Sequence, residues 1–212
     1  MIYQRENTLP YPQPWEYVMH NIFNNAKNLF FVDVGAHDGL CSSNTAYAEM
    51  DLEWNGICIE PHPDVYPKLI KNRKCKTYNC CVSENTQEVE FCSIRGYSEM
   101  LSGIKSAYDE NHMDRIKNEI TNHGGELNII KIQSKTLNDL FQENNINHIN
   151  YLSIDTEGSE LNVLKSVDLN KYKIDVISAE NNGYNSDVKN YLNDLYLFVG
   201  KVCHDEIYMR KP

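Results

Sequence analysis

The chain lacks any apolar segment long enough to cross a membrane. No window approaches the ~18 consecutive apolar residues that a membrane helix requires. The first residues, MIYQRENTLPYPQPW, contain no basic region followed by an apolar stretch, so they do not resemble a secretory signal peptide. We therefore expect a cytoplasmic protein without membrane insertion.

Cysteines in a metal-binding or disulfide arrangement are also missing. There is no C-x-x-C pair, and the number of cysteines, seven, is odd. Several of them lie inside apolar, strand-like runs, where a thiol behaves as a small hydrophobic group. The pattern favours buried free thiols in a reducing cytosol over a disulfide framework or a zinc site. The cysteines occupy positions 41, 58, 75, 80, 81, 92 and 203.

The sequence has no excess of basic residues. Thirty acidic residues stand against 20 basic ones, which gives a net charge of −10. Proteins that follow a phosphate backbone usually present a basic face, so nucleic acid is not an expected partner. The basic stretch KLIKNRKCK, residues 68–76, is interpreted as the solvated end of a helix. A neutral small molecule or a glycan fits this charge balance better.

The sequence does contain an alternation of apolar, β-branched runs with helix-length amphipathic segments. This alternation predicts an α/β fold with a mostly parallel sheet and helices on both faces. We expect parallel strands at 29–34, 56–60, 76–82, 149–155 and 175–180. We expect helices at 15–27, 43–50, 63–72, 137–143, 159–166 and 186–195. The runs LYLFVGKV and EIYMRK are separated only by CHD, so they should pair as an antiparallel hairpin.

No linker or internal repeat interrupts this pattern, so residues 1–212 are expected to form a single domain. Residues 1–28 form an N-terminal extension that is proline-rich at first and then helical. Residues 95–125 form a polar insertion that ends at a flexible Gly124–Gly125 turn, after a hairpin-like EVEFCSI segment and before a strand-like run at 127–132.

A glycine-rich turn, FFVDVGAHDGL at residues 30–40, follows the first predicted strand. Gly35 and Gly39 allow the backbone to turn tightly and to approach a ligand. Ligands bind at the carboxyl ends of strands in open α/β sheets, which is where this turn lies. The simpler alternative is a strand-to-helix connection without a ligand.

The residues of the turn favour a cationic cofactor over a dinucleotide. The middle glycine of G-x-G-x-x-G is absent, and His37 and Asp38 occupy the turn. A pyrophosphate would be repelled by Asp33 and Asp38, whereas the sulfonium and ammonium groups of S-adenosylmethionine would be attracted. Glu60 ends the second strand, 21 residues after Gly39, where a carboxylate can accept the hydroxyl protons of a ribose.

Three further strand ends carry side chains suited to a site for the cofactor or for a metal ion. Val82, at the end of the third strand, is expected to pack on the adenine ring. Asp155 ends the fourth strand, and Glu180 and Asn181 end the fifth. Oxygen ligands converging from neighbouring strands suit Mg²⁺ or Ca²⁺, which can bind two hydroxyls of a substrate and lower the pKa of one. Alternatively, Asp155 caps the following helix, and Glu180 acts without a metal.

Candidates for the catalytic base are histidines and acids near these strand ends. His37 lies inside the cofactor turn, which distinguishes it from a histidine on an ordinary surface, and its unperturbed pKa of about 6.5 suits proton transfer. Glu180 is the other principal candidate. The remaining candidates are His62, His204 and Glu157.

Taken together, these segments resemble the FkbM family of S-adenosylmethionine-dependent methyltransferases. The resemblance spans about residues 29–210, and the combination of WNGICIEP with IDTEGSELNVL is its most specific part. The other matching stretches are FVDVGAHDG, SSNTAYAE, the continuation HPDVYPKL, MLSGIKSAYD, NYLS, KSVDL and DEIYMRK. The resemblance implies a class I, Rossmann-like methyltransferase sheet of seven strands, with O-methylation as the usual activity.

The same resemblance implies roles for individual residues. Asp33, Gly35 and Gly39 would hold the methionine portion of the cofactor, Glu60 its ribose, and Asp155 would lie beside the reacting methyl group. Asp155 with Glu180 and Asn181 is similar, more distantly, to the metal site of catechol-type O-methyltransferases.

The leading hypothesis is therefore methylation of a sugar or glycan hydroxyl. The first 28 residues and much of 95–125 lie outside the strongest matches, and we expect them to cover the pocket and shape the choice of acceptor. Two alternatives stay open. One is methylation of a non-sugar hydroxyl or an amine on a small metabolite, and the other is a non-catalytic module that binds S-adenosylmethionine or a glycan.

Overall fold

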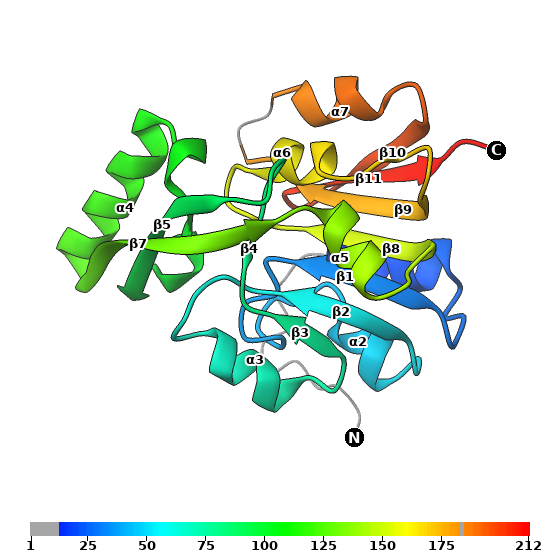
Figure 1. Ribbon diagram of the computed structural model, residues 1–212, viewed down its shortest axis with the longest axis horizontal. Helices are drawn as coiled ribbons and strands as arrows, with labels where there is room; N and C mark the ends of the chain where they lie inside the picture. The colour runs from blue at the N-terminus through cyan, green and yellow to red at the C-terminus, as the bar shows by residue number, and fades with distance from the viewer. Residues whose placement is uncertain (1–12, 183–184) are drawn as a thin grey trace.

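The computed structural model describes residues 13–182 and 185–212, and its centre is a seven-stranded sheet (Figure 1). The strand order is β10-β11-β9-β8-β1-β2-β3, and all pairings are parallel except those of β11. The strands are β1 (Phe30–Val34), β2 (Asn55–Ile59), β3 (Lys76–Tyr78), β8 (His148–Ile154), β9 (Lys173–Glu180), β10 (Tyr196–Val202) and β11 (Asp205–Arg210). The predicted fold, including the antiparallel C-terminal hairpin, is confirmed.

Two apolar cores cover the two faces of this sheet. One core joins the sheet residues Val32 and Ile154 to the helices α5 (Leu137–Glu143), α6 (Glu160–Lys165) and α7 (Asp187–Leu192). The other joins Phe31 and Tyr151 to the N-terminal helical segment, α2 (Ala46–Met50) and α3 (Tyr66–Asn72). Neighbouring residues of β1 thus enter opposite cores, as the two-residue period of a strand requires.

The third predicted strand, 76–82, is divided between two sheets, which the sequence did not indicate. β3 pairs with β2 only as far as Tyr78, and β4 (Cys81–Val82) then pairs with β7 (Gly125–Lys135). Asn79 lies between the two strands, and its side-chain amide donates to the carbonyl oxygens of Glu60 and Pro61 at 2.8 and 3.0 Å. The amide therefore ties the break in the strand to the end of β2.

The second sheet has the order β4-β7-β5-β6 and lies beside the main sheet (Figure 1). Its long antiparallel pair consists of β5 (Glu88–Gly96) and β7, and β6 (Gly103–Ile104) is a short edge strand. The predicted polar insertion includes a 14-residue helix, α4 (Glu110–His123), which the sequence analysis did not predict.

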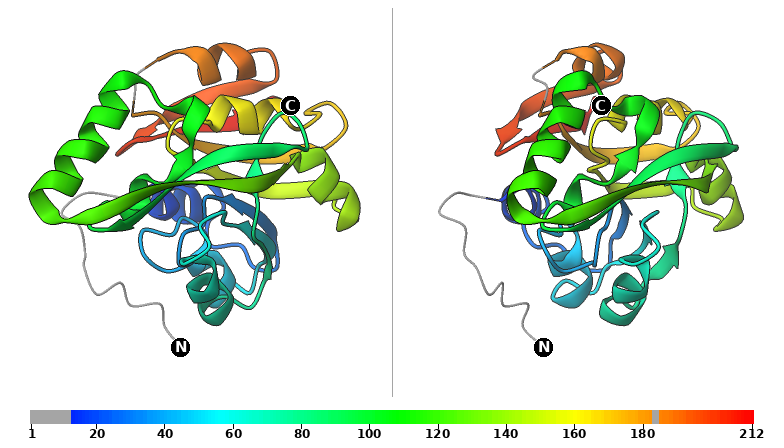
Figure 2. Two further views of the ribbon diagram at one scale, coloured as in Figure 1. Left: turned by 60° about the vertical axis from the view of Figure 1, so that its left-hand side comes forward. Right: turned by 90° about the vertical axis from the view of Figure 1, so that its left-hand side faces the viewer.

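Local sequence explains where α4 begins and ends. The carboxylate of Asp109 accepts a hydrogen bond from the backbone N–H of His112 at 2.7 Å, which satisfies a free donor of the first turn. Gly124, with φ 77°, ends the helix. Between these ends, Ile116 is fully buried against Ile94 and Leu101. The helix therefore covers the far end of the β5–β7 pair (Figure 2).

The N-terminal segment is less regular than predicted. In place of a helix over 15–27, α1 (Pro14–Glu16) continues into a π-helical segment, Tyr17–Ile22. Asn24 and Asn25 both have positive φ values, 47° and 54°, which end the helix. The proline-rich stretch before residue 13 lies outside the described residues.

The seven cysteines are free, as predicted, and four of them are buried. Cys41 and Cys203 are exposed, so burial does not extend to all of the thiols. Within residues 13–182 and 185–212, no helix is both long and apolar enough to span a bilayer.

Candidate functional site

A cavity lies at the carboxyl ends of β1, β2 and β8, where the sequence places the glycine turn. Its walls include Asp33, Gly35, His37, Glu60 and Asp155. The predicted cofactor residue Val82 also contributes to the lining. The second sheet and its connections supply further residues, among them Phe91, Met100, Ser102, Gly103 and Ile104. The two sheets thus enclose the site between them.

Gly35 fixes the distance between the turn and the end of β8. Its φ is 84°, and a Cβ atom there would lie 1.6 Å from the carbonyl oxygen of Asp155. Its backbone N–H donates to the carbonyl of Ile59 at 2.9 Å. Gly35 therefore lets the turn pack directly on the backbone of β8 while remaining bonded to the end of β2.

Gly39 performs a similar role toward α3. Its φ is 80°, and a Cβ atom there would lie 2.6 Å from Cγ of Arg73 and 2.7 Å from Cδ1 of Leu69. The second glycine is required because the turn lies directly against a buried arginine.

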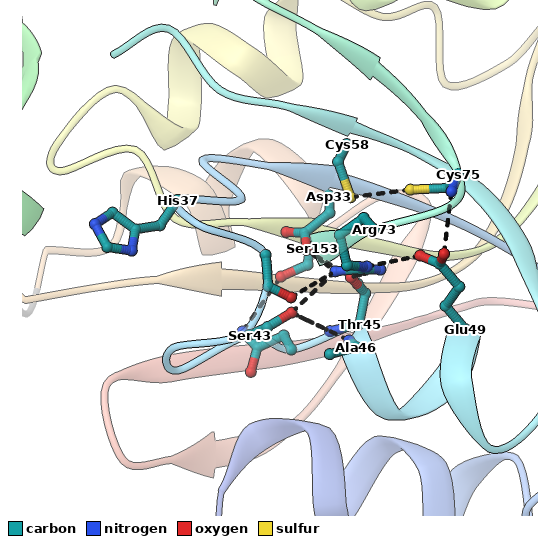
Figure 3. Close-up of polar contacts among 12 residues, drawn as sticks. Asp33, His37, Ser43, Thr45, Ala46, Glu49, Cys58, Arg73, Cys75 and Ser153 are labelled. Carbon is teal, nitrogen blue, oxygen red and sulfur yellow. Dashed lines mark hydrogen bonds and ion pairs between the residues drawn. The ribbon is translucent and has the colours of Figure 1, made fainter. Parts of the chain in front are cut away.

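Arg73 forms the centre of a buried polar network behind the turn (Figure 3). Its Nε donates to Glu49 at 2.6 Å, and its Nη1 donates to the carbonyl oxygen of Gly39 at 3.1 Å. Its side chain is fully buried, so the interpretation of 68–76 as a solvated helix end is wrong for this residue. The lysines at 68, 71 and 74 are exposed, as predicted.

Asp33 belongs to this network. The hydroxyl of Thr45 donates to Asp33 Oδ2 at 2.6 Å, and Nη1 of Arg73 lies 4.0 Å from the same oxygen. Burial raises the pKa of Asp33, although the arginine and the hydroxyl bond favour its charged form. The structure therefore gives Asp33 a positively charged neighbour within the protein, which the sequence interpretation did not include.

Glu60 closes the turn from the side of β2. Its two carboxylate oxygens accept backbone N–H groups, one from His37 at 2.8 Å and one from His62 at 2.7 Å. The residue is only 6% exposed, and burial raises its pKa to about 7. Each oxygen retains a lone pair, so the carboxylate can accept a further hydrogen bond from a ligand.

His37 projects away from the Arg73 network, at the mouth of the turn (Figure 3). Its φ is 48°, and neither ring nitrogen has a hydrogen-bond partner among the described residues. Carboxylate oxygens of Glu99 and Asp38 lie 3.4 and 3.8 Å from the ring. Burial lowers the pKa of His37, but the surrounding carboxylates outweigh it and the net shift is upward.

Three carboxylates converge at the other side of the cavity, and two of them, Asp155 and Glu157, line it. Asp155, Glu157 and Glu180 each offer an oxygen, and these oxygens lie within 4.8 Å of one another. Oε2 of Glu157 is buried without a hydrogen-bond partner among the described residues. Burial and then the charge of Glu180 raise the pKa of Asp155 well above its usual range and that of Glu157 to about 8. A cation would relieve this repulsion.

Asn181, the third predicted metal ligand, makes other contacts. Its side-chain nitrogen donates to the carbonyl of Asn185 at 2.8 Å and to Glu206 at 3.0 Å. Glu157 is the residue that joins Asp155 and Glu180. The sequence interpretation considered Glu157 as a base and not as a metal ligand, because its left-handed backbone, φ 54°, is not visible in the sequence.

Three further residues of the site were not identified from the sequence. Arg73 lies in a lysine-rich stretch that was interpreted as exposed. Glu99 lies in the insertion, and its closeness to His37 was not predictable because the two are far apart along the chain. Asp205 is brought beside Glu180 by the pairing of β11 with β9, and burial raises its pKa to about 7. Asp205 is the last residue of the CHD connection, so the predicted hairpin was the sequence feature from which its position could have been inferred.

Comparisons with known proteins identify the family and a similar fold. A family model described as the methyltransferase FkbM domain matches residues 33–206. A solved structure, methyltransferase FkbM from Methylobacillus flagellatus KT, is similar with a TM-score of 0.58 and 15% sequence identity. The likeness covers 94% of this chain and 48% of that chain, so this chain spans about half the length of that protein. No curated protein matches the sequence.

Proposed function

The chain belongs to the FkbM family of methyltransferases, and on this premise we propose that it transfers a methyl group from S-adenosylmethionine to a hydroxyl of a sugar or glycan. The observation that carries the cofactor assignment is the cavity in which the glycine turn, Glu60 and Asp155 meet. The non-basic charge balance and the oxygen-rich strand ends support a hydroxyl-bearing acceptor.

The residues of the cavity suit the cofactor chemically. Glu60 offers free lone pairs to the ribose hydroxyls, and the turn at Gly35 and His37 lies beside the position proposed for the methionine portion. Val82 offers an apolar surface to the adenine ring. The buried ring nitrogens of His37 and Oε2 of Glu157 have no hydrogen-bond partners among the described residues, so both retain hydrogen-bonding capacity for a ligand.

The enclosed space in the cavity is about 80 Å³. Small-molecule sites usually provide about 300–1,000 Å³, so cofactor binding requires the walls to separate. Glu99, Met100, Ser102, Gly103 and Ile104 form one wall of the cavity. The side chain of Glu99 is paired with the exposed Lys68 at 3.1 Å, a kind of contact that costs little to break. We expect the segment Glu99–Ile104 to move outward when the cofactor binds.

S-adenosylmethionine supplies an electrophilic methyl group, and the protein's task is to align an acceptor oxygen and remove its proton. Asp155 and Glu180 are the proposed acids beside the reaction, and His37 is a proposed base at the turn. A divalent cation held by Asp155 and Glu180, with Glu157 and the predicted ligand Asn181 nearby, would offset their mutual repulsion. It would also favour the ionised form of a bound hydroxyl.

The test is the release of S-adenosylhomocysteine from purified protein with S-adenosylmethionine and a panel of sugars, glycans, phenols and amines. We expect turnover with at least one sugar, and Asp155→Asn should lower it about a hundredfold or more. Asp194→Asn is the matched control, because Asp194 is exposed and remote from the cavity. Turnover with phenols or amines but with no sugar would refute the sugar acceptor.

The cation is tested separately, by removing divalent ions with a chelator and adding back Mg²⁺, Ca²⁺ or Mn²⁺. We expect turnover to fall with the chelator and to return with one of these ions. Full activity in the chelator, together with no heat of Mg²⁺ binding in calorimetry, would eliminate the metal site while leaving the methyltransferase assignment intact.

A further inference from the structure

A second cavity of about 780 Å³ lies between the N-terminal helical segment and the turn that joins β10 to β11. Tyr17, His20 and Asn21 contribute to its wall from the helical side. Lys201 and His204 contribute from the hairpin. These residues are absent from the lining of the cofactor cavity, so the two spaces are distinct.

The hairpin side of this cavity is bonded to the end of β9, where the acids of the proposed reaction lie. The backbone N–H of Asn181 donates to the carbonyl of His204 at 2.8 Å, and Nζ of Lys201 donates to the carbonyl of Asn181 at 2.8 Å. One residue further on, Asp205 pairs with Glu180 in the sheet. The hairpin that forms this wall is therefore hydrogen-bonded to the end of β9, which carries Glu180.

Asn44 connects the same hairpin to the cofactor cavity. Its side-chain nitrogen donates to Asp205 Oδ2 at 3.0 Å and to the hydroxyl of Ser153 at 3.2 Å. Asn44 and Ser153 both line the cofactor cavity. Asp205 is thus bonded to a residue of the cofactor cavity, and it directly follows His204, a residue of the second cavity.

The lining identifies the class of ligand. It presents a carboxylate at Glu16, an amide at Asn21, imidazoles at His20 and His204, a phenol at Tyr17 and an ammonium group at Lys201. These groups donate and accept hydrogen bonds in several directions, and the tyrosine ring adds an apolar face. A polyhydroxylated ring suits both the hydrogen-bonding groups and the apolar face, because its hydroxyls need hydrogen-bond partners and its C–H faces pack on aromatic rings.

We propose that the cavity between the N-terminal helical segment and the β10–β11 turn is the acceptor site, and that it binds a carbohydrate. This inference rests on the proposed function. It assigns acceptor recognition to Tyr17, His20, Asn21 and His204, near the two ends of the sequence, rather than to the insertion at 95–125. The insertion then serves the cofactor cavity, whose wall it forms.

The test measures sugar binding directly, without turnover. Methyl glycosides of glucose, galactose, mannose, rhamnose and fucose are titrated into the protein in the presence of S-adenosylhomocysteine, and saturation-transfer NMR reports their contacts. At least one glycoside should bind. Asn21→Ala and His204→Ala should each weaken its binding about fivefold, the effect of one lost hydrogen bond.

Both substitutions suit this test because the structure gives neither side chain a hydrogen bond or ion pair within the described residues. His148→Ala is the matched control, since His148 is exposed, begins β8 and lines neither cavity. It should leave glycoside binding unchanged. All three variants should bind S-adenosylhomocysteine as the wild type does, which establishes that they are folded.

Two results would overturn the proposal. Absence of glycoside binding in wild-type protein that binds S-adenosylhomocysteine would refute the carbohydrate ligand, and undiminished binding in both cavity variants would refute its location. Failure to bind S-adenosylhomocysteine at all would instead count against the proposed function on which the inference depends, and would leave this acceptor site without its reaction.

Discussion

At the scale of single residues, Arg73 determines whether the glycine turn can keep its shape. Its guanidinium lies within reach of two buried acids, Asp33 and Glu49, and it also bonds the carbonyl of Gly39. Removing the arginine would leave both carboxylates buried without their positive partner. A buried charge that loses its partner is far more costly than an exposed ion pair.

Arg73→Ala should therefore lower the free energy of unfolding by about 3–5 kcal/mol, measured by urea denaturation. Lys74→Ala is the matched control, because that side chain is exposed and adjacent, and it should change stability by less than about 0.5 kcal/mol. Equal stability of the two variants would show that the Arg73 network does not support the fold.

The sequence predicted the positions of the turn and of Glu60 because both follow from strand ends and glycine spacing. It did not predict the partners of Asp33, since burial of Arg73 depends on how α3 packs against the turn. Likewise, Glu157 lies beside Asp155 and Glu180 because of a left-handed backbone conformation, which no residue pattern predicted. Local pattern identified the candidate residues, and tertiary packing determined their neighbours.

At the scale of elements, the second sheet is the main feature that the sequence left unassigned. Its strands do not show a regular alternation of buried and exposed residues, because β7 is largely exposed along its length. The segment predicted as one strand, 76–82, is divided between two sheets, and the polar insertion contains a helix that was not predicted. Such features depend on pairing between residues distant in sequence, whereas the parallel strands of the main sheet are recognisable from their own apolar runs.

The second sheet depends on a small core of its own, so its stability can be tested separately. Ile116→Ala in α4 removes a fully buried side chain from the cluster with Ile94 and Leu101. Amides of β5 and β7 should exchange with deuterium at least about tenfold faster, while those of β8 and β9 keep their protection.

Lys117→Ala is the control for this experiment, since Lys117 is the exposed neighbour of Ile116 in the same helix. It should leave the exchange pattern of both sheets unchanged. Equal acceleration across the main sheet in Ile116→Ala would show instead that the two sheets unfold as one unit.

At the scale of the whole molecule, the buried acids make stability depend on pH. Burial raises the pKa of Glu60 from 4.5 to about 7, and that of Asp205 from 3.8 to about 7. Between the ordinary pKa of each acid and its raised value near 7, the folded protein holds protons that the unfolded chain has released. The free energy of unfolding therefore falls as the pH rises through this range. The raised pKa of His37 acts in the same direction as the pH passes through it.

The melting temperature of the ligand-free protein should therefore be lower at pH 8 than at pH 5.5, by about 5 °C or more. Differential scanning fluorimetry at constant ionic strength measures this change. Glu60→Gln should reduce the difference, because the substitution removes one of the groups that titrate. A melting temperature that rises from pH 5.5 to pH 8 would contradict the burial of these acids.

The central claim, that the cavity at the ends of β1, β2 and β8 binds S-adenosylmethionine through Glu60, is tested most directly by calorimetry. The wild type should bind one S-adenosylmethionine per chain, and Glu60→Ala should bind it at least about tenfold more weakly. Glu53→Ala, which removes an exposed carboxylate paired with Lys27, should bind it unchanged. Absence of binding by the wild type, or equal affinity in Glu60→Ala, would contradict the claim.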